Sequence, residues 1–438
     1  MSYLLVASRT PVAFNLRRAE LLAIGAALFI QSGAIVVLIA MDGGMELTDS
    51  GRALLRQVAF PVYLLSVALL ALNSGQFIIA MRRSLWLLAL HALPFVSVLW
   101  SIAPGLTLRR SVALLFSLLL SYAIAIRTTP AQGLRIVSVT LGLCMALSLG
   151  MMAAMPGMAI SVDDGALRGV FNNKNVLGWA ASISSLAAGV MIYDRAAGQR
   201  RLGLWIFFPS LACLLFSGSA TGLFAAISGA GLGVFYEMLK KTRNLGRAVL
   251  VLVFLQLTAL ILVFLAFFLT PLLGALGKDR TLTGRVPLWQ LVDQQIAARP
   301  LLGFGYQAFW SEGNPEAWGI WGQIRWFAPH AHNGYREILL NFGVLGGVLV
   351  AILLVMILWR GALLHCRSRD SAWLWPNILM GQLLIINLTE STLLVQNHFQ
   401  WSLMAVVMLW VLLASSGARH RRIAAREVER RASREAAP

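Results

Sequence analysis

Four short polar segments of this chain carry side chains that could bind an anion or move a proton. They lie at residues 167–175, 283–289, 330–337 and 387–391, each beside a long apolar run. The first two contain arginine, the third contains two histidines, and the fourth contains the carboxylate of Glu390. Guanidinium groups bind phosphate oxygens and imidazole accepts protons near neutral pH, so these segments are the candidates for a site.

Arg168 and Arg285 are the candidate phosphate ligands. A guanidinium group binds phosphate oxygens through two parallel hydrogen bonds and stays charged at any working pH. Two such groups on external loops, at the level of the lipid headgroups, would suit a lipid-linked diphosphate. The alternative is that they bind ordinary phospholipid headgroups or cap helices.

His332, followed directly by Asn333, is the candidate proton acceptor. An imidazole that accepts a proton near neutral pH could activate a sugar hydroxyl, although a purely structural role is the alternative. His330 and His332 are separated by one residue, as in some metal sites, but no third ligand of the right kind lies nearby in the sequence. Structural metal sites usually have more ligands, so we predict no metal and no cofactor.

The carboxylates have different expected roles. Glu390 lies at the end of an apolar run, where a charge is costly unless it is paired or used. Its two interpretations are a structural partner of an external arginine and a residue of the site. Asp163 and Asp164 lie close to Arg168 but lack further oxygen ligands at the spacing of a cation site, so we interpret them as solvated loop charges.

The composition indicates the elements that must position these residues. Of 438 residues, 58% are hydrophobic and only 12% are charged, whereas a soluble domain is about a quarter charged. Apolar runs of about twenty residues cross the hydrocarbon core as helices, because a helix satisfies its own backbone there. We therefore predict an all-α polytopic membrane protein whose first span is a retained anchor. Twelve spans are predicted, at residues 20–41, 56–72, 84–101, 110–126, 136–155, 175–193, 202–217, 219–237, 248–272, 335–359, 374–392 and 400–416.

The distribution of the net charge of +18 predicts the orientation. With the amino terminus inside, about two thirds of the Lys and Arg residues fall in cytoplasmic segments, which is the positive-inside pattern. Both termini are then cytoplasmic, and the basic tail 417–438 lies along anionic headgroups. This distribution argues against a nucleic-acid partner. It also places the loop 156–174 and the segment 273–334 outside.

The predicted organisation has four parts. Residues 1–272 hold the first nine spans, 273–334 form an external cap, 335–416 hold the last three spans, and 417–438 form the tail. The cap segment is too long for an ordinary connection and too rich in aromatic residues for a disordered one. We expect short helices in it, including one from Arg285 to Ala298 with Trp289, Val292 and Ile296 on one face.

These features together resemble the O-antigen ligase and Wzy-type polymerase superfamily of bacterial polysaccharide assembly. The resemblance rests on many spans, a long loop late in the chain, and a His-Asn pair that opens the following helix. Residues 171–178 and 387–391 are most similar to the exopolysaccharide polymerases of the succinoglycan type.

The resemblance implies a GT-C-like, metal-independent glycosyltransferase of the bacterial inner membrane. Its active site would face the periplasm, and its donor would be an undecaprenyl-diphosphate-linked glycan. It implies that Arg168 and Arg285 hold the diphosphate and that His332 activates the acceptor hydroxyl. Other expected partners are membrane lipids and further proteins of polysaccharide assembly and export. The residues expected to contact the substrate are Asn173, Lys174, Trp289, His330, Asn333, Arg336 and Glu390.

Three functions are compatible with this sequence, besides a purely structural assembly partner. A polymerase would join lipid-linked repeat units, whereas a ligase would move a finished glycan to lipid A-core or to a protein. The subgroup resemblance favours the polymerase. A transporter of small anions would need charged groups or broken helices near the bilayer midplane, and His91 is the main ionisable residue within a predicted span.

Overall fold

The computed structural model describes residues 11–34, 41–42, 46–47, 49–162, 164–194, 199–275, 284–368 and 371–415. Asp163, Thr283 and the tail 417–438, all part of the interpretation above, lie outside the described residues. Within the described residues the chain is helical apart from loops and one two-stranded antiparallel pair, β1 (Met41–Asp42) and β2 (Glu46–Leu47).

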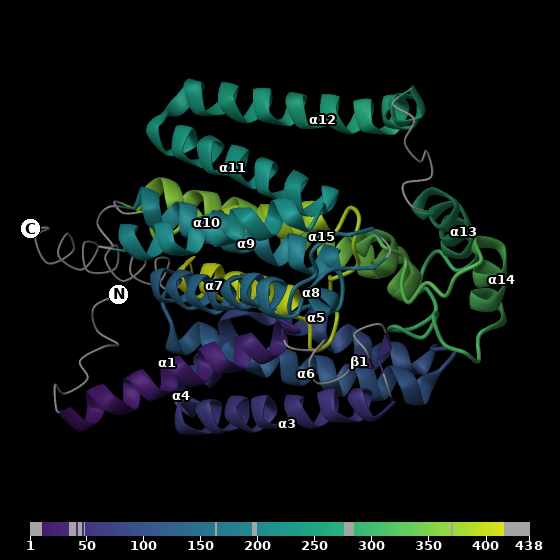
Figure 1. Ribbon diagram of the computed structural model, residues 1–438, viewed down its shortest axis with the longest axis horizontal. Helices are drawn as coiled ribbons and strands as arrows, with labels where there is room; N and C mark the ends of the chain where they lie inside the picture. The colour runs from purple at the N-terminus through teal and green to yellow at the C-terminus, as the bar shows by residue number, and fades with distance from the viewer. Residues whose placement is uncertain are drawn as a thin grey trace, which may run out of the picture. The chain divides into compact units, whose positions relative to one another are not determined.

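Figure 1 labels the helices and colours them by their order in the chain. They are α1 (Pro11–Gln31), α3 (Asp49–Leu72), α4 (Ser74–Arg83), α5 (Leu85–Val96), η1 (Ser97–Leu99), α6 (Pro104–Arg127), α7 (Pro130–Ala154), α8 (Pro156–Ala159), α9 (Lys174–Tyr193), α10 (Arg200–Phe216), α11 (Ala220–Lys241), α12 (Asn244–Ala275), α13 (Arg285–Ala298), α14 (Pro315–Ile324), α15 (Gly334–Arg367) and α16 (Leu374–Ile386), followed by a helix over Phe399–Ser415.

The helix α15 illustrates why these helices belong in a membrane. Its buried face carries apolar residues such as Leu353 and Ile357, but apolar residues also form an exposed stripe at helical spacing. That stripe includes Val348, Ile352 and Val355. A helix of a soluble protein would place polar residues on its outer face, whereas a helix that is apolar on all sides is suited to lipid. The chain is an integral membrane protein.

Five described helices are long and apolar enough to cross a bilayer, or up to six if the bent pair Gln57–Leu72 and Ser74–Arg83 is one span. They are α6, α7, α9, α11 and α15. Each of the twelve predicted spans overlaps a helix, but several of these helices are shorter. The all-helical membrane class is therefore confirmed, while the number of twelve crossings and the GT-C-like fold stay predictions.

The chain divides into two compact units, of which unit 1 comprises residues 1–73, 126–227 and 397–399. Within unit 1, α7, α9 and α10 run side by side (Figure 1). Small residues line the contact between α9 and α10: the Ser210 hydroxyl donates to the Ser184 hydroxyl at 2.8 Å, and a Cβ at Gly203 would lie 3.0 Å from the Ala188 carbonyl. Small side chains let membrane helices approach closely, and this packing supports the loop that leads into α9.

Unit 2 comprises residues 74–125, 228–396 and 400–438, and its longest helix, α15, is interrupted. At Gly343 the backbone has φ 61° and ψ −159°, which is not helical. The segment 300–305 replaces the lost helical hydrogen bonds: the amides of residues 304–305 donate to the carbonyls of residues 340–341 (2.9 and 3.0 Å). In return, the amides of residues 344–345 donate to the carbonyls of residues 300–301 (2.7 and 3.3 Å). Irregular backbone is tolerated at membrane depth only where protein covers it in this way.

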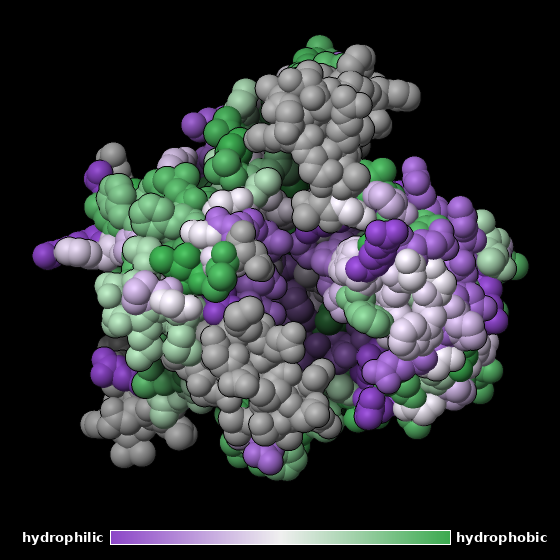
Figure 2. Space-filling model, turned by 45° about the vertical axis from the view of Figure 1, so that its right-hand side comes forward, coloured by the Kyte–Doolittle hydropathy of each residue, from purple (hydrophilic) through white to green (hydrophobic). Residues whose placement is uncertain are grey.

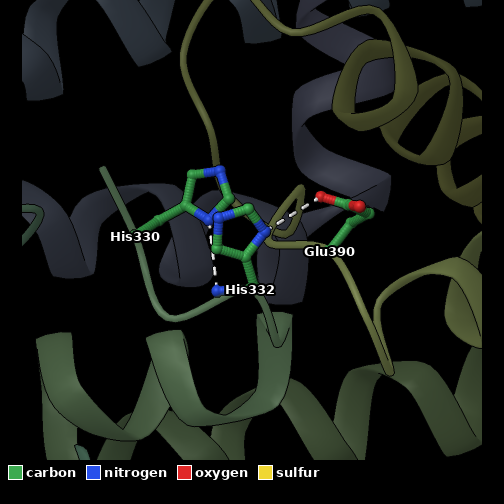
Figure 3. Close-up of side chains that lie close together, drawn as sticks. All are labelled: His330, His332 and Glu390. Atoms are coloured by element: carbon green, nitrogen blue, oxygen red, sulfur yellow. Dashed lines mark hydrogen bonds and ion pairs between the residues drawn. The ribbon is translucent and has the colours of Figure 1, made fainter. Parts of the chain in front are cut away.

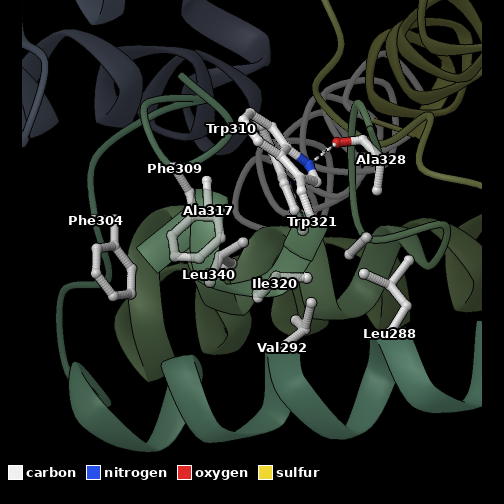
Figure 4. Packing of buried hydrophobic residues seen from close by; sticks show 11 residues of the cluster. Leu288, Val292, Phe304, Phe309, Trp310, Ala317, Ile320, Trp321, Ala328 and Leu340 are labelled. Carbon is white, nitrogen blue, oxygen red and sulfur yellow. Dashed lines mark hydrogen bonds between the residues drawn. The ribbon is translucent and has the colours of Figure 1, made fainter. Parts of the chain in front are cut away.

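The segment 284–333 contains two short helices, α13 and α14, around an apolar cluster of its own. Leu288 and Val292 of α13 face Ile320 and Trp321 of α14, and Leu340 of α15 closes the cluster (Figure 4). The helix from Arg285 to Ala298 is confirmed, with Val292 fully buried on its inner face. Figure 2 shows hydrophilic residues gathered on the side of the molecule that carries these two helices.

Candidate functional site

The helix α16 ends before the predicted span does, and this places Glu390 in a loop. The predicted span reached residue 392, but the helix ends at Ile386. The reason is Asn387, whose buried side-chain oxygen accepts hydrogen bonds from the amides of Thr392 (2.9 Å) and Leu393 (3.1 Å). An asparagine side chain that binds the backbone in this way competes with helix formation. Residues 387–393 therefore form a fixed turn.

This turn is joined to the start of α15. Asn333 caps the helix, and its side-chain oxygen accepts hydrogen bonds from the amides of residues 335 and 336 (3.1 and 3.0 Å). Its side-chain nitrogen donates to the Leu388 carbonyl, and its backbone amide donates to the Ser391 hydroxyl, both at 3.0 Å. The amide of Gly334 donates to the Asn387 carbonyl at 2.8 Å. The two predicted segments 330–337 and 387–391 thus form one rigid element.

A guanidinium, a carboxylate and an imidazole form a row beside this element. Arg285 Nη2 donates to Glu390 Oε1 at 2.8 Å, and the other carboxylate oxygen lies 3.5 Å from His332 Nδ1. The three side chains are partly buried, with exposed fractions of 17%, 14% and 20%. The interpretation of Glu390 as a partner of an arginine is therefore confirmed, while its role as a residue of the site stays a prediction.

His330 completes a cluster with His332 and Glu390 (Figure 3). The amide of His332 donates to His330 Nδ1 at 3.1 Å, and the two imidazole rings lie 4.2 Å apart. One potential ligand atom from each of His330, His332 and Glu390 lies within 4.8 Å of the others. A potential third ligand therefore does lie beside the two histidines, and the sequence did not indicate it because Glu390 comes from a distant part of the chain.

Trp289 and Arg336 belong to the neighbouring surface. Trp289 Nε1 donates to the Ala331 carbonyl at 3.0 Å, which fixes the segment that carries the histidines. Arg336 lies over the Trp289 ring and binds Asp293 through two hydrogen bonds of 2.8 and 3.0 Å. Arg336 is thus committed to a carboxylate. Trp326 adds an aromatic face, 5.5 Å from the His332 ring.

Arg168 lies in unit 1, and its surroundings differ from those of Arg285. Its backbone and that of Gly169 donate to the Ala159 carbonyl, and its Nε donates to the Met158 carbonyl at 3.0 Å. No carboxylate pairs with it among the described residues. The side chain is only 8% exposed, and burial lowers the pKa of its guanidinium below the usual value. In the described part of this loop, backbone carbonyls therefore hold a buried cation.

Asn173 and Lys174 begin α9 in the same unit. The side-chain oxygen of Asn173 accepts a hydrogen bond from the Val176 amide at 3.0 Å, so it acts as the cap of that helix. Lys174 forms an ion pair with Asp164, and this bond holds the pKa of the Asp164 carboxyl below its usual range. Asp164 is therefore an exposed loop charge, as we predicted, and it is also paired with Lys174.

The candidate residues fall into two groups. Unit 2 brings together Arg285, Glu390, His332, His330, Asn333, Trp289 and Arg336. Unit 1 carries Arg168, Asn173 and Lys174. The convergence of Arg168 with Arg285 and His332 stays a prediction.

Two residues beside the candidate site, Asp293 and Asn387, have roles that the sequence did not indicate. Asp293, which binds Arg336, is an ordinary acidic residue of a helix, and only its contact with Arg336 makes it part of the site. Asn387 was part of a predicted motif, but its role in ending α16 and joining the two segments follows from its hydrogen bonds. Local composition cannot reveal either pairing.

Comparisons with known proteins agree with the resemblance seen in the sequence. Residues 205–351 match the family described as O-Antigen ligase, a stretch that includes Arg285, His332 and Asn333. The chain is also 31% identical over 287 residues to the exopolysaccharide production protein ExoQ of Rhizobium meliloti (strain 1021). That alignment covers 62% of this chain and 63% of the relative.

Proposed function

We propose that this chain, which is similar to the O-Antigen ligase family and to an exopolysaccharide production protein, is a membrane glycosyltransferase. Its reaction is the polymerisation of undecaprenyl-diphosphate-linked oligosaccharide units into an exopolysaccharide. The observation that carries the proposal is the row of Arg285, Glu390 and His332, with contacts of 2.8 and 3.5 Å. The row places a guanidinium that can bind an anion and an imidazole that can accept a proton on the two oxygens of one carboxylate.

The proton acceptor is His332. Its Nδ1 lies 3.5 Å from a Glu390 oxygen, so an imidazolium formed by proton uptake is stabilised by the neighbouring carboxylate. Nε2 then takes the proton of the acceptor hydroxyl. Asn333 fixes the backbone beside it through the Ser391 and Leu388 contacts, which holds the imidazole in place.

The leaving group is the lipid diphosphate. The acceptor oxygen forms a bond to the anomeric carbon from the opposite face while the bond from that carbon to the phosphate oxygen breaks. The electron pair leaves with the diphosphate, and Arg168 and Arg285 stabilise the charge that develops there. The aromatic side chains Trp289 and Trp326 stack on sugar rings and exclude water. The reaction needs no metal ion for this route.

The site lies in the inner membrane and faces the periplasm, with both termini in the cytoplasm. This orientation follows from the excess of Lys and Arg in the predicted cytoplasmic segments. Membrane lipids surround the helices, and other proteins of polysaccharide assembly and export receive the product.

A ligase is the second candidate, because the matched family is described as O-Antigen ligase. The chemistry at the anomeric carbon would be the same, and only the acceptor would differ. The name of the relative, an exopolysaccharide production protein, favours the polymerase.

One reconstitution tests the proposal. The purified chain in lipid vesicles receives an undecaprenyl-diphosphate repeat unit, with and without a chelator, and the products are separated by length. A ladder of products that survives the chelator is the expected result. A single transfer that requires a lipid A-type acceptor would favour the ligase, and the absence of any transfer with either acceptor would contradict both.

A further inference from the structure

We propose that a Zn²⁺ ion binds between His330, His332 and Glu390 and inhibits the chain when it does so. The binding site stands on geometry alone. Only the inhibition rests on the proposed function, because it assumes that His332 must be free to accept a proton.

The first argument is the ligand set. Two imidazoles and one carboxylate each offer an atom within 4.8 Å of the others, so small side-chain rotations bring them to one ion. Zn²⁺ binds histidine and glutamate, and three protein ligands leave a fourth position open for water or substrate. Imidazole ligands favour Zn²⁺ over Mg²⁺ or Ca²⁺, which prefer oxygen.

The second argument is the state of His332. Both of its ring nitrogens are shielded from solvent and lack a hydrogen-bond partner in the described part of the chain. Buried polar atoms without a partner are unfavourable, and a metal ion would satisfy one of these nitrogens. The backbone of His332 has φ 48°, a left-handed conformation that is uncommon for residues other than glycine but that histidine adopts more readily than most. This turn places the His332 ring beside Glu390, with Nδ1 3.5 Å from a carboxylate oxygen.

The third argument is that the ligands are already fixed. Asn333, directly after His332, is bonded to Ser391, directly after Glu390. Ligands from segments far apart in the sequence are thus held close together before any ion arrives. Such preorganisation reduces the cost of binding.

Two features limit the affinity. Arg285 binds Glu390 Oε1, and its positive charge opposes a nearby cation, although Oε2 faces His332 and remains available to the metal. His330 Nδ1 accepts a hydrogen bond from the His332 amide, so the proton of the neutral ring is on Nε2. An ion that binds Nδ1 must replace this hydrogen bond, and an ion that binds Nε2 must displace the proton. We therefore expect a reversible site that responds to the zinc concentration, in contrast to a permanently filled structural site.

The consequence for the reaction is direct. An imidazole nitrogen that binds Zn²⁺ has no lone pair for the proton of an acceptor hydroxyl, and a carboxylate that binds Zn²⁺ stabilises an imidazolium less. Zinc should therefore lower kcat without preventing the binding of the lipid-linked donor.

The binding test uses the full chain in lipid nanodiscs, purified with a tag that contains no histidine. Calorimetry with ZnCl₂ and the visible absorption of bound Co²⁺ report the site. Wild type should bind one ion, with Mg²⁺ giving no signal. His330→Ala, His332→Ala and Glu390→Gln should each weaken binding by at least about tenfold, since even outer partners of a metal site contribute 10–100-fold.

The matched control is His420→Ala, which removes an imidazole from the tail, outside the described residues. It should bind zinc as wild type does. Zinc should also raise the melting temperature of wild type and of this control, but not that of the three site variants. Zinc binding that all three site variants retain would overturn the site, and the melting curves without zinc show whether each variant is folded.

The activity test separates the two claims. Zinc should reduce transfer by the wild type, and a chelator should restore it. Binding without any effect on transfer, or with stimulation, would overturn the inhibition. A chain that performs no transfer under any condition would instead contradict the proposed function, while calorimetry would still decide whether the zinc site exists.

Discussion

The two candidate arginines are held in opposite ways. Arg285 in unit 2 is paired with a carboxylate at 2.8 Å, whereas Arg168 in unit 1 is held through its Nε by a backbone carbonyl at 3.0 Å. In the loop of Arg168 the described carboxylate, Asp164, is already bound to Lys174. The loop thus neutralises its lysine and leaves its arginine without an anionic partner among the described residues.

Under the proposed mechanism, this difference predicts different roles for the two residues. A buried guanidinium without a carboxylate gains most from an incoming anion, because the anion supplies the missing charge and hydrogen bonds. In the proposed mechanism, Arg168 therefore binds the diphosphate in the ground state. Arg285 would share its guanidinium between Glu390 and the phosphate, and would so couple the diphosphate to the Glu390–His332 pair. The following predictions test this division.

The largest effect is expected for His332→Ala. Removal of a general base lowers the rate by about 10²–10⁴-fold, and the effect should fall on kcat because the imidazole acts only in the transition state. Single-turnover transfer by the reconstituted chain measures it. Asn333 and Ser391 still hold the backbone, so the melting temperature should change little. Normal turnover by this variant would remove His332 from the mechanism.

The second prediction compares Arg168→Ala with Arg285→Ala. Each substitution removes hydrogen bonds to a charged group, worth about 1.5–3 kcal/mol, or roughly 10–150-fold. Arg168→Ala should mainly raise KM for the lipid-linked donor. Arg285→Ala should mainly lower kcat, because it also releases Glu390.

Glu390→Gln provides the control for this comparison. If Arg285 acts through Glu390, the double variant should lose much less activity than the two single losses predict together. A double-mutant cycle on kcat gives the coupling. Fully additive losses, or the same kinetic defect in both arginine variants, would show that the two residues share one role.

The positions of the helices could be predicted from the sequence, but the break inside a helix could not. Each predicted span is a long apolar run, which is a local property, so a helix was found at every position. The break of α15 at Gly343 was missed, because it depends on hydrogen bonds from residues 300–305. The helix α4 was missed because it is short and amphipathic and ends in Arg82 and Arg83.

The same limit applies to the site. The sequence indicated the chemistry of Arg285, His332 and Glu390, because charged and imidazole groups beside apolar runs are unusual. It offered an external arginine as a partner of Glu390 but did not identify Arg285, since the two residues are 105 residues apart. A potential third metal ligand was missed for this reason: Glu390 lies close to the two histidines only in three dimensions.

A third and smaller effect is expected for Gly334→Ala. A Cβ at this position would lie 2.1 Å from the Asn387 side-chain oxygen, so the turn that carries Glu390 would have to move. Overpacking of this kind costs about 1–3 kcal/mol of stability. Thermal unfolding and transfer activity should both decrease.

Gly319→Ala in α14 is the matched control, because no atom lies within 4 Å of its added Cβ. It should leave both measurements unchanged or raise the stability slightly, since alanine favours helix. Equal behaviour of the two glycine variants would mean that the close approach of residues 334 and 387 does not position the site.

The smallest effect concerns the pair that Lys174 forms with Asp164, the described carboxylate in the loop of Arg168. The hydrogen bond from Lys174 holds the pKa of Asp164 below its usual value of about 3.9. A carboxyl group with a lowered pKa stabilises the fold above its unfolded pKa, and this stabilisation disappears as the pH falls through the folded pKa. The pair is largely exposed, so its contribution should stay below about 1 kcal/mol. Melting temperatures of wild type and Asp164→Asn should therefore differ slightly near neutral pH and converge in acid. A difference that persists at the lowest pH would show that Asp164 acts through packing, and the contrast between the two loops would then lose its electrostatic basis.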